Sequence, residues 1–170
     1  KMCDVSLSTR WYPEHNTYHN RQYKEPITLH EDLTDAEVKE IKILNILGGE
    51  PFVDKIHVKF LERLVENKNT ELYISYTSNG QQLAHKQIEE TLKHFSNIQL
   101  NLSIDGTDKL FEYIRWPGKW EKLKHVMDHY KTKGWLVTAY TTLSNMNVYY
   151  YDDLLEWILK NFAINEFKYQ

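Results

Sequence analysis

The side chains best suited to chemistry begin at Gly48-Gly49-Glu50-Pro51, which ends the apolar run 41–47. Adjacent glycines leave the backbone bare, so a ligand can approach it closely. Pro51 fixes one φ angle and removes a donor, which makes the turn rigid and can leave a nearby carbonyl free. Glu50 adds the only charge on this rim. The alternative explanation is a strand-to-helix turn that merely needs flexible residues.

Three further polar segments follow apolar stretches in the same way. They are Thr77-Ser78-Asn79-Gly80, Ser103-Ile104-Asp105-Gly106 and the segment Ser144–Asn147. The carboxyl ends of parallel strands share one edge of a sheet, and ligands bind at that edge. Turn chemistry alone would also place Gly and Asn there. The spacing therefore predicts a binding edge without naming its ligand.

The elements that must position these segments alternate between strand and helix. We predict strands at Ile41–Leu47, Leu72–Tyr76, Ile98–Ile104, Trp135–Leu143 and Ile164–Tyr169. Apolar stripes at helical spacing lie at 33–40, 56–65, 88–95, 120–130 and 154–162. One unit about every 30 residues is the size of a βα unit. The pattern predicts an α/β fold, with a parallel sheet and helices outside it.

Length and composition limit the class of protein. The chain has 170 residues, which suggests a single domain spanning 1–170. The net charge of −3 gives no indication of a nucleic-acid partner. The apolar runs are far shorter than the ~20 residues of a membrane helix, so we expect no membrane association. One cysteine excludes an internal disulfide framework and fits a cytoplasmic location.

Taken together and in chain order, these motifs resemble those of radical SAM enzymes. Gly48–Pro51 resembles their glycine-glycine-glutamate-proline motif, and Thr77–Gly80 resembles the Thr-Asn-Gly end of their third strand. Ser103–Gly106 with the downstream Arg115 resembles their Ser-x-Asp-Gly pattern, and the segment 142–147 is similar to their fifth-strand end. The nearest group carries a "twitch" domain. The resemblance implies a partial parallel (β/α)6 barrel of the TIM type.

The resemblance also implies cofactors and partners. Such enzymes use a 4Fe-4S cluster to cleave S-adenosyl-L-methionine into a 5′-deoxyadenosyl radical, which takes hydrogen from a substrate. The substrate here, a small molecule or a peptide, is not identified, and an electron-donor protein is implied. The family holds its cluster with a Cys-x3-Cys-x2-Cys loop, of which Cys3 would be the third cysteine. The chain then reads as truncated at both ends, and with one cysteine it is expected to be inactive by itself.

By the same resemblance, the methionyl part of the cofactor has clear partners. The carbonyls of Gly48 and Gly49 suit its ammonium, with Glu50 as a carboxylate close by. Arg115 suits its carboxylate, because a guanidinium offers a fixed bidentate fork. Ser103 can hydrogen-bond the same carboxylate. Pro51 completes the turn, and no catalytic residue is assigned.

The ribose and adenine would be contacted by polar side chains of the other segments. These are Thr77, Asn79, Asp105 and Asn147. An alternative for Asp105 is a helix N-cap before Lys109. An alternative for Arg115 is a surface ion pair with Glu112, three residues earlier.

Two other functions stay open at this point. The chain could be a non-catalytic α/β module that binds a nucleotide or a protein partner. It could also be a zinc-stabilised interaction domain, since His15 and His19 with Cys3 imitate part of a zinc-finger spacing. A single cysteine and the lack of a local apolar core argue against zinc.

Overall fold

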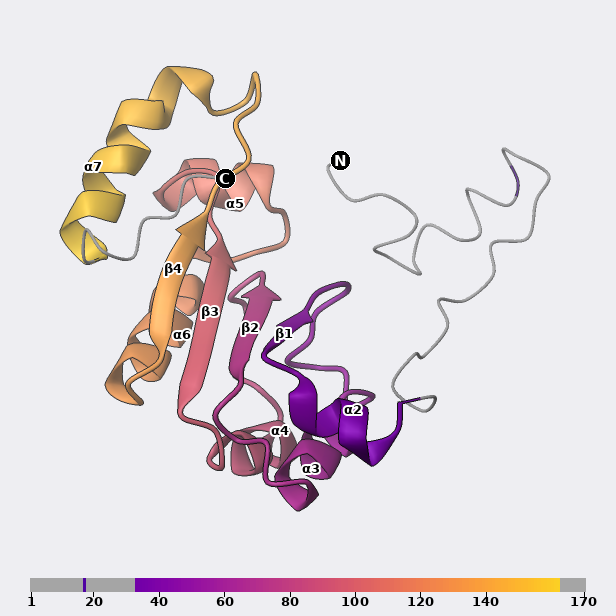
Figure 1. Cartoon of the computed structure of the whole chain (residues 1–170). Helices are drawn as coiled ribbons and strands as arrows, with labels where there is room; N and C mark the ends of the chain where they lie inside the picture. Colours follow the sequence, from indigo (N-terminus) through magenta and orange to yellow (C-terminus); the bar gives the residue numbers. More distant parts are fainter. Residues whose placement is uncertain (1–16, 18–32, 163–170) are drawn as a thin grey trace.

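The computed structural model describes residue 17 and residues 33–162, which form a parallel sheet with helices packed against it (Figure 1). The strands are β1 (Ile43–Ile46), β2 (Tyr73–Ser78), β3 (Asn97–Ser103) and β4 (Leu136–Tyr140). They lie in the order β1-β2-β3-β4, and every neighbouring pair is parallel. Sequential parallel order is the arrangement of a partial (β/α) barrel, so the predicted fold class is confirmed.

Helices alternate with the strands as the sequence predicts. They are α2 (Asp35–Glu40), α3 (Val58–Glu66), α4 (Lys86–Leu92), α5 (Asp108–Ile114), α6 (Trp120–Thr132) and α7 (Tyr151–Asn161), with the short 3-10 helix η4 (Val148–Tyr150). A capping box of Thr34 and Glu37 starts α2. Gly134, at φ +78°, follows α6 in the left-handed conformation of a helix end. Helix α5 is an addition to the predicted set.

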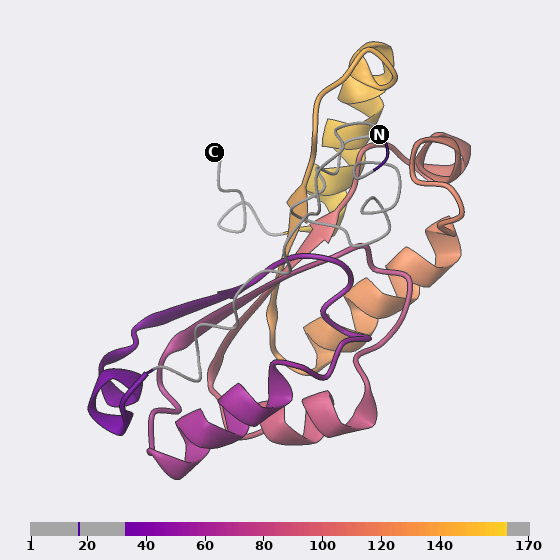
Figure 2. The same ribbon diagram turned by 90° about the vertical axis from the view of Figure 1, so that its right-hand side faces the viewer.

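One face of the sheet is apolar and covered by α3, α4 and α6, which lie together on one side of it (Figure 2). The pairing register places Ile74, Leu100 and Val137 on this face, all 0% exposed. Their partners include Leu61 and Leu64 of α3, Ile88 of α4 and Leu123 of α6. Burial of this surface stabilises the fold at about 25 cal/mol per Å².

The other face of the sheet carries polar side chains, although these are buried as well. Asn101 is 1% exposed and donates to Ser75 Oγ at 2.8 Å, while Thr138 donates to Asn101 Oδ1 at 2.7 Å. Gln99 donates to both Asn101 and Thr138. Buried polar groups are tolerated when they bond one another. The network joins β2, β3 and β4 and favours a single strand register.

Some predictions fall outside the described residues. These are the final strand at Ile164–Tyr169 and the site residues Cys3, His15 and His19. No helix within residues 33–162 is both long and apolar enough to cross a membrane.

Candidate functional site

The glycine turn after β1 presents bare backbone at the carboxyl edge of the sheet. Gly48 has φ +102°, so the turn itself requires glycine there. Gly49 has no such requirement, since a Cβ at this position would meet no atom within 4 Å. The flexible-turn explanation therefore accounts for Gly48 and not for Gly49. No hydrogen bond joins either glycine carbonyl to another residue within 33–162.

Glu50 connects this turn to the end of β2. Its Oε1 accepts from Ser78 Oγ at 2.8 Å, and its Oε2 accepts from the backbone N–H of Asn79 at 2.9 Å. The N–H of Phe52 lies 3.4 Å from Oε1. The buried Pro51 fixes the chain that follows. Two strand ends are therefore held together through one carboxylate.

Glu50 has neutral partners only. Within residues 33–162, no lysine, arginine or histidine forms an ion pair with it. Burial raises the pKa of Glu50, and the hydrogen bonds from Asn79, Ser78 and Phe52 offset this only in part. A cation brought by a ligand would relieve the unfavourable burial of this carboxylate.

The end of β2 offers two further polar side chains. Thr77 Oγ1 is buried and has no hydrogen-bond partner among the residues that the structure describes. Asn79 is exposed, and its Oδ1 accepts from the N–H of Gln81 at 2.9 Å. Ser103 is half-buried at the end of β3.

Asp105 and Arg115, both predicted site residues, are brought into direct contact. Arg115 Nη2 lies 2.6 Å from Asp105 Oδ2, and the side chain of Asp105 is 0% exposed. The other oxygen, Oδ1, accepts from the N–H of Thr142 at 2.8 Å. Oδ1 is therefore hydrogen-bonded, whereas Oδ2 contacts the guanidinium but has no hydrogen-bond partner among the described residues. Because the side chain is fully buried, a direct contact of Asp105 with ribose or adenine would require the surrounding residues to move.

The side-chain amide of Asn147 is likewise occupied by hydrogen bonds within the protein. It is 1% exposed, and its Nδ2 donates to the carbonyls of Asp105 and Thr142, both at 2.9 Å. Its Oδ1 accepts from the N–H of Ser144 at 2.7 Å. The side chain therefore holds the segment after β4 against the end of β3. The predicted contact with the cofactor would require Asn147 to break these hydrogen bonds.

The structure supports neither of the two alternatives that the sequence raised for Asp105 and Arg115. Glu112 Oε2 forms its ion pair with Lys119 Nζ, at 3.1 Å, and not with Arg115. Helix α5 begins after Thr107, so Asp105 is not its N-cap.

Sequence reasoning missed Ser78 and Thr142 as supports of this edge. Ser78 is 2% exposed, and its hydroxyl orients Glu50. Thr142 acts through its backbone N–H, which no sequence signal could reveal. For Ser78 the available signal was a hydroxyl at the end of a predicted strand, between two residues that were selected.

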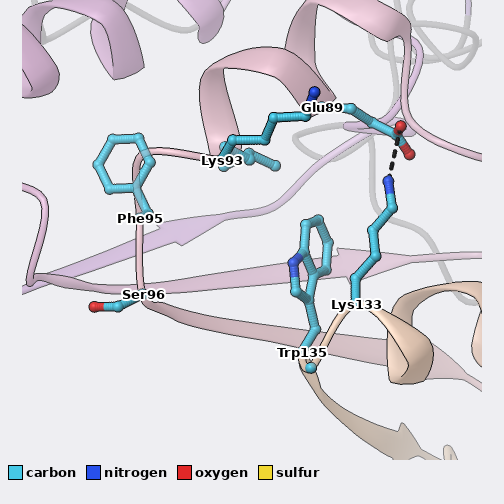
Figure 3. A pocket seen from close by; sticks show the side chains of 8 residues that line it. Glu89, Lys93, Phe95, Ser96, Lys133 and Trp135 are labelled. Carbon is cyan, nitrogen blue, oxygen red and sulfur yellow. Dashed lines mark ion pairs between the residues drawn. The ribbon is translucent and has the colours of Figure 1, made fainter.

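A separate pocket lies near the amino ends of β3 and β4 (Figure 3). It is lined by Glu89, Leu92, Lys93, Phe95, Ser96, Lys133, Gly134 and Trp135. Its charged groups are already paired, with Lys133 Nζ 2.9 Å from a Glu89 oxygen and Lys93 Nζ 2.6 Å from Glu90. This pocket does not include any predicted site residue.

The carboxyl edge is therefore the candidate site. It combines bare glycine backbone, a carboxylate without a cation and a guanidinium at the rim. An α-amino acid group carries the opposite charges, an ammonium and a carboxylate, so the edge is chemically suited to it. In barrel-type α/β domains, ligands bind at this edge of the parallel sheet.

Comparison with known families identifies the class further. Residues 1–158 match the sequence profile described as "Radical SAM superfamily". The chain belongs to the Radical SAM superfamily, as the motifs predicted. No curated protein matches it.

A solved structure titled "Native anSMEcpe with bound AdoMet" has a similar fold. The TM-score is 0.56 at 16% sequence identity, and the match covers 88% of this chain and 43% of that chain. The present chain thus spans less than half the length of that structure. At this identity the likeness shows the shared fold alone.

The donor sets present can be compared with the cofactors that the family implies. Glu50, the open Gly49 and Arg115 fit the charged groups of S-adenosylmethionine. The cluster is different, because no group of three His, Cys, Asp or Glu side chains that could hold a metal occurs within residues 33–162. The whole sequence contains one cysteine, whereas such clusters are held by several thiolates. These residues do not fit a cluster by themselves.

Proposed function

We propose that this chain is the core domain of a radical SAM enzyme that binds S-adenosylmethionine at the carboxyl edge of its sheet. In such enzymes a reduced 4Fe-4S cluster supplies the electron that cleaves this cofactor, and the resulting 5′-deoxyadenosyl radical takes hydrogen from a substrate. Cys3 is the only cysteine of this sequence, and one thiolate cannot hold a 4Fe-4S cluster. The other ligands would have to come from beyond this sequence.

The observation that carries the proposal is the environment of Glu50. Among residues 33–162, this half-buried carboxylate is bonded only by neutral donors, and it lies beside a glycine that the described fold does not require. An ammonium bound here would gain a charge partner and the free carbonyls of Gly48 and Gly49. Both features are explained by a cationic ligand that approaches the backbone closely.

The remaining predicted residues contact the other groups of the cofactor or support the shape of the site. Arg115 and Ser103 receive the methionyl carboxylate at the end of β3. Asn79 and Thr77, whose buried hydroxyl has no partner in the described part of the chain, contact the ribose or the adenine. Asn147 keeps the segment after β4 in place, so that the edge holds one shape. The protein thereby orients the cofactor and limits access of water, while the cofactor supplies the reactive chemistry.

The broader proposal follows from the family. Residues 1–170 form one domain of the twitch-containing group, located in the cytoplasm, with an electron-donor protein as partner. The substrate is a small molecule or a peptide. These points rest on the resemblance of the motifs.

The test is anaerobic purification of the full-length protein as it is encoded, followed by reconstitution with iron and sulfide. We expect a brown protein that forms 5′-deoxyadenosine from S-adenosylmethionine and a reductant. A colourless protein that still binds S-adenosylmethionine would instead identify a non-catalytic nucleotide-binding module. Stoichiometric zinc would favour the interaction domain that uses Cys3, His15 and His19.

A further inference from the structure

The ion pair between Asp105 and Arg115 joins a buried carboxylate to a guanidinium at the rim of the candidate site. The side chain of Asp105 is 0% exposed and that of Arg115 is 24% exposed. A buried charge is strongly unfavourable without a partner. Within residues 33–162, Arg115 is the only cation paired with Asp105, so the position of each depends on the other.

Asp105 is itself held rigidly. Its Oδ1 accepts from the N–H of Thr142 at 2.8 Å, and its carbonyl accepts from Asn147 Nδ2 at 2.9 Å. The next residue, Gly106, lies so close to α5 that a Cβ there would be 2.8 Å from Leu110 Cγ. The carboxylate therefore has a fixed position and can hold the guanidinium in one orientation.

Arg115 keeps donors for a second anion. The contact with Asp105 uses Nη2, and Nε is buried without a hydrogen-bond partner among the described residues. A guanidinium has five N–H donors in a rigid plane, so it can contact two carboxylates at once. A buried donor without a partner is unfavourable until a ligand supplies an acceptor.

We propose that Asp105 is a positioning residue that orients Arg115 toward the carboxylate of bound S-adenosylmethionine. The inference rests on the proposed function, because it assumes that this cofactor occupies the edge. It replaces the predicted ribose contact of Asp105 with an indirect role, in which Asp105 acts through Arg115.

The experiment compares two ligands that differ by one group, S-adenosylmethionine and its decarboxylated form, S-adenosylmethioninamine. Dissociation constants are measured by calorimetry on the full-length, reconstituted protein. The wild-type protein should bind the carboxylate-bearing ligand at least about tenfold more tightly. Asp105→Asn keeps the acceptor for Thr142 and should reduce this preference by about tenfold, with no change for the decarboxylated ligand.

The control variant is Glu112→Gln, which removes the charge from a neighbouring ion pair, that of Glu112 on α5 with Lys119. This variant should leave the preference for the carboxylate-bearing ligand unchanged. An unchanged preference in Asp105→Asn overturns the proposal. An equal loss for both ligands also overturns it, since that is the result of a merely structural role. A wild-type protein that binds neither ligand contradicts the proposed function itself, so the two failures are distinguishable.

Circular dichroism establishes first whether Asp105→Asn folds. If it does not, Arg115→Lys decides the question. An ammonium lacks the planar fork needed to contact Asp105 and a ligand carboxylate side by side, so the preference should again fall about tenfold. A lysine variant with the wild-type preference would contradict the proposal.

Discussion

Glu50, in the turn after β1, and Glu89, on α4, are two partly buried carboxylates that differ in their partners. Glu50, after β1, is bonded by the Ser78 hydroxyl and by backbone N–H groups, and burial raises its pKa. Glu89, on α4 near the amino ends of β3 and β4, contacts Lys133 at 2.9 Å and the Tyr130 hydroxyl at 3.0 Å (Figure 3). Burial alone would raise the pKa of Glu89, but the hydrogen bonds from Lys133 and Tyr130 outweigh it and lower the pKa.

The difference shows which carboxylate is complete within the protein. Glu89 has its cation, so its charge contributes to folding. Glu50 has none within residues 33–162, so its charge is unfavourable to folding and available to a ligand. The four predictions below test this contrast.

Glu50→Gln should have the largest effect on binding. The amide keeps the shape of the side chain and can still bond Ser78 and Asn79, but it removes the charge that attracts an ammonium. We expect S-adenosylmethionine binding to weaken by about 1.5–3 kcal/mol, measured by calorimetry. The free energy of unfolding in urea should not decrease. Unchanged affinity in this variant would contradict the role of Glu50.

Gly49→Ala should weaken the same binding by about 1–3 kcal/mol, because the added methyl occupies the space of the ligand. Folding should be unaffected, since a Cβ at Gly49 meets no atom within 4 Å. The matched control is Gly106→Ala, whose Cβ would lie 2.8 Å from Leu110 Cγ and which should lower the melting temperature instead. A Gly49→Ala protein that melts early but binds normally would reverse our assignment.

Glu89→Gln should act on stability alone. Loss of the charge-assisted hydrogen bond from Lys133 should lower the free energy of unfolding by about 1 kcal/mol, measured in urea. The affinity for S-adenosylmethionine should stay at the wild-type value, because the partners of Glu89 among the described residues are Lys133, Tyr130 and His129, none of them a residue of the candidate site. A clear loss of affinity would show that the two carboxylates are coupled.

The smallest expected effect is on the pH dependence of stability. The ordinary pKa of both carboxyls is 4.5. Because the folded pKa of Glu50 is raised, its favourable contribution is present below pH 4.5 and is lost as the pH rises through the folded value. For Glu89 the folded pKa is lowered, so its contribution is present above pH 4.5 and is lost as the pH falls.

Urea unfolding between pH 3 and pH 7 separates these contributions when each glutamine variant is compared with the wild-type protein. The advantage of Glu50→Gln over wild type should grow with rising pH, and the deficit of Glu89→Gln should grow in the same direction. Parallel curves for either variant would contradict the corresponding assignment.

Much of the fold could be predicted from local pattern. The four strands within residues 33–162 lie where apolar runs placed them, although β1 is shorter than Ile41–Leu47 and β4 shorter than Trp135–Leu143. Strands end where pairing ends, and this depends on the neighbouring strand rather than on the residues themselves. Helix α5 was missed because it is short and buries only Phe111, which gives a weak apolar stripe.

The candidate site was predictable in membership but not in its contacts. Turn residues at strand ends placed Glu50, Asp105 and Asn147 at one edge, since parallel strands end together, and the family resemblance added Arg115. The sequence suggested Glu112 as an alternative partner of Arg115 because it lies three residues earlier. The actual partner, Asp105, lies on the other side of helix α5 in the sequence, and only the folded chain brings its Oδ2 within 2.6 Å of Arg115 Nη2.

By itself, then, the sequence determined the α/β alternation, the binding edge and the family, because these depend on residue type and order along the chain. Tertiary structure alone decided which polar groups are occupied. Among the described residues, Glu50 is without a cation while Glu89 has Lys133, and Asp105 is paired with Arg115 while Thr77 Oγ1 has no hydrogen-bond partner. Burial and partners set the charge state and the availability of each group, and both arise from residues distant in the chain.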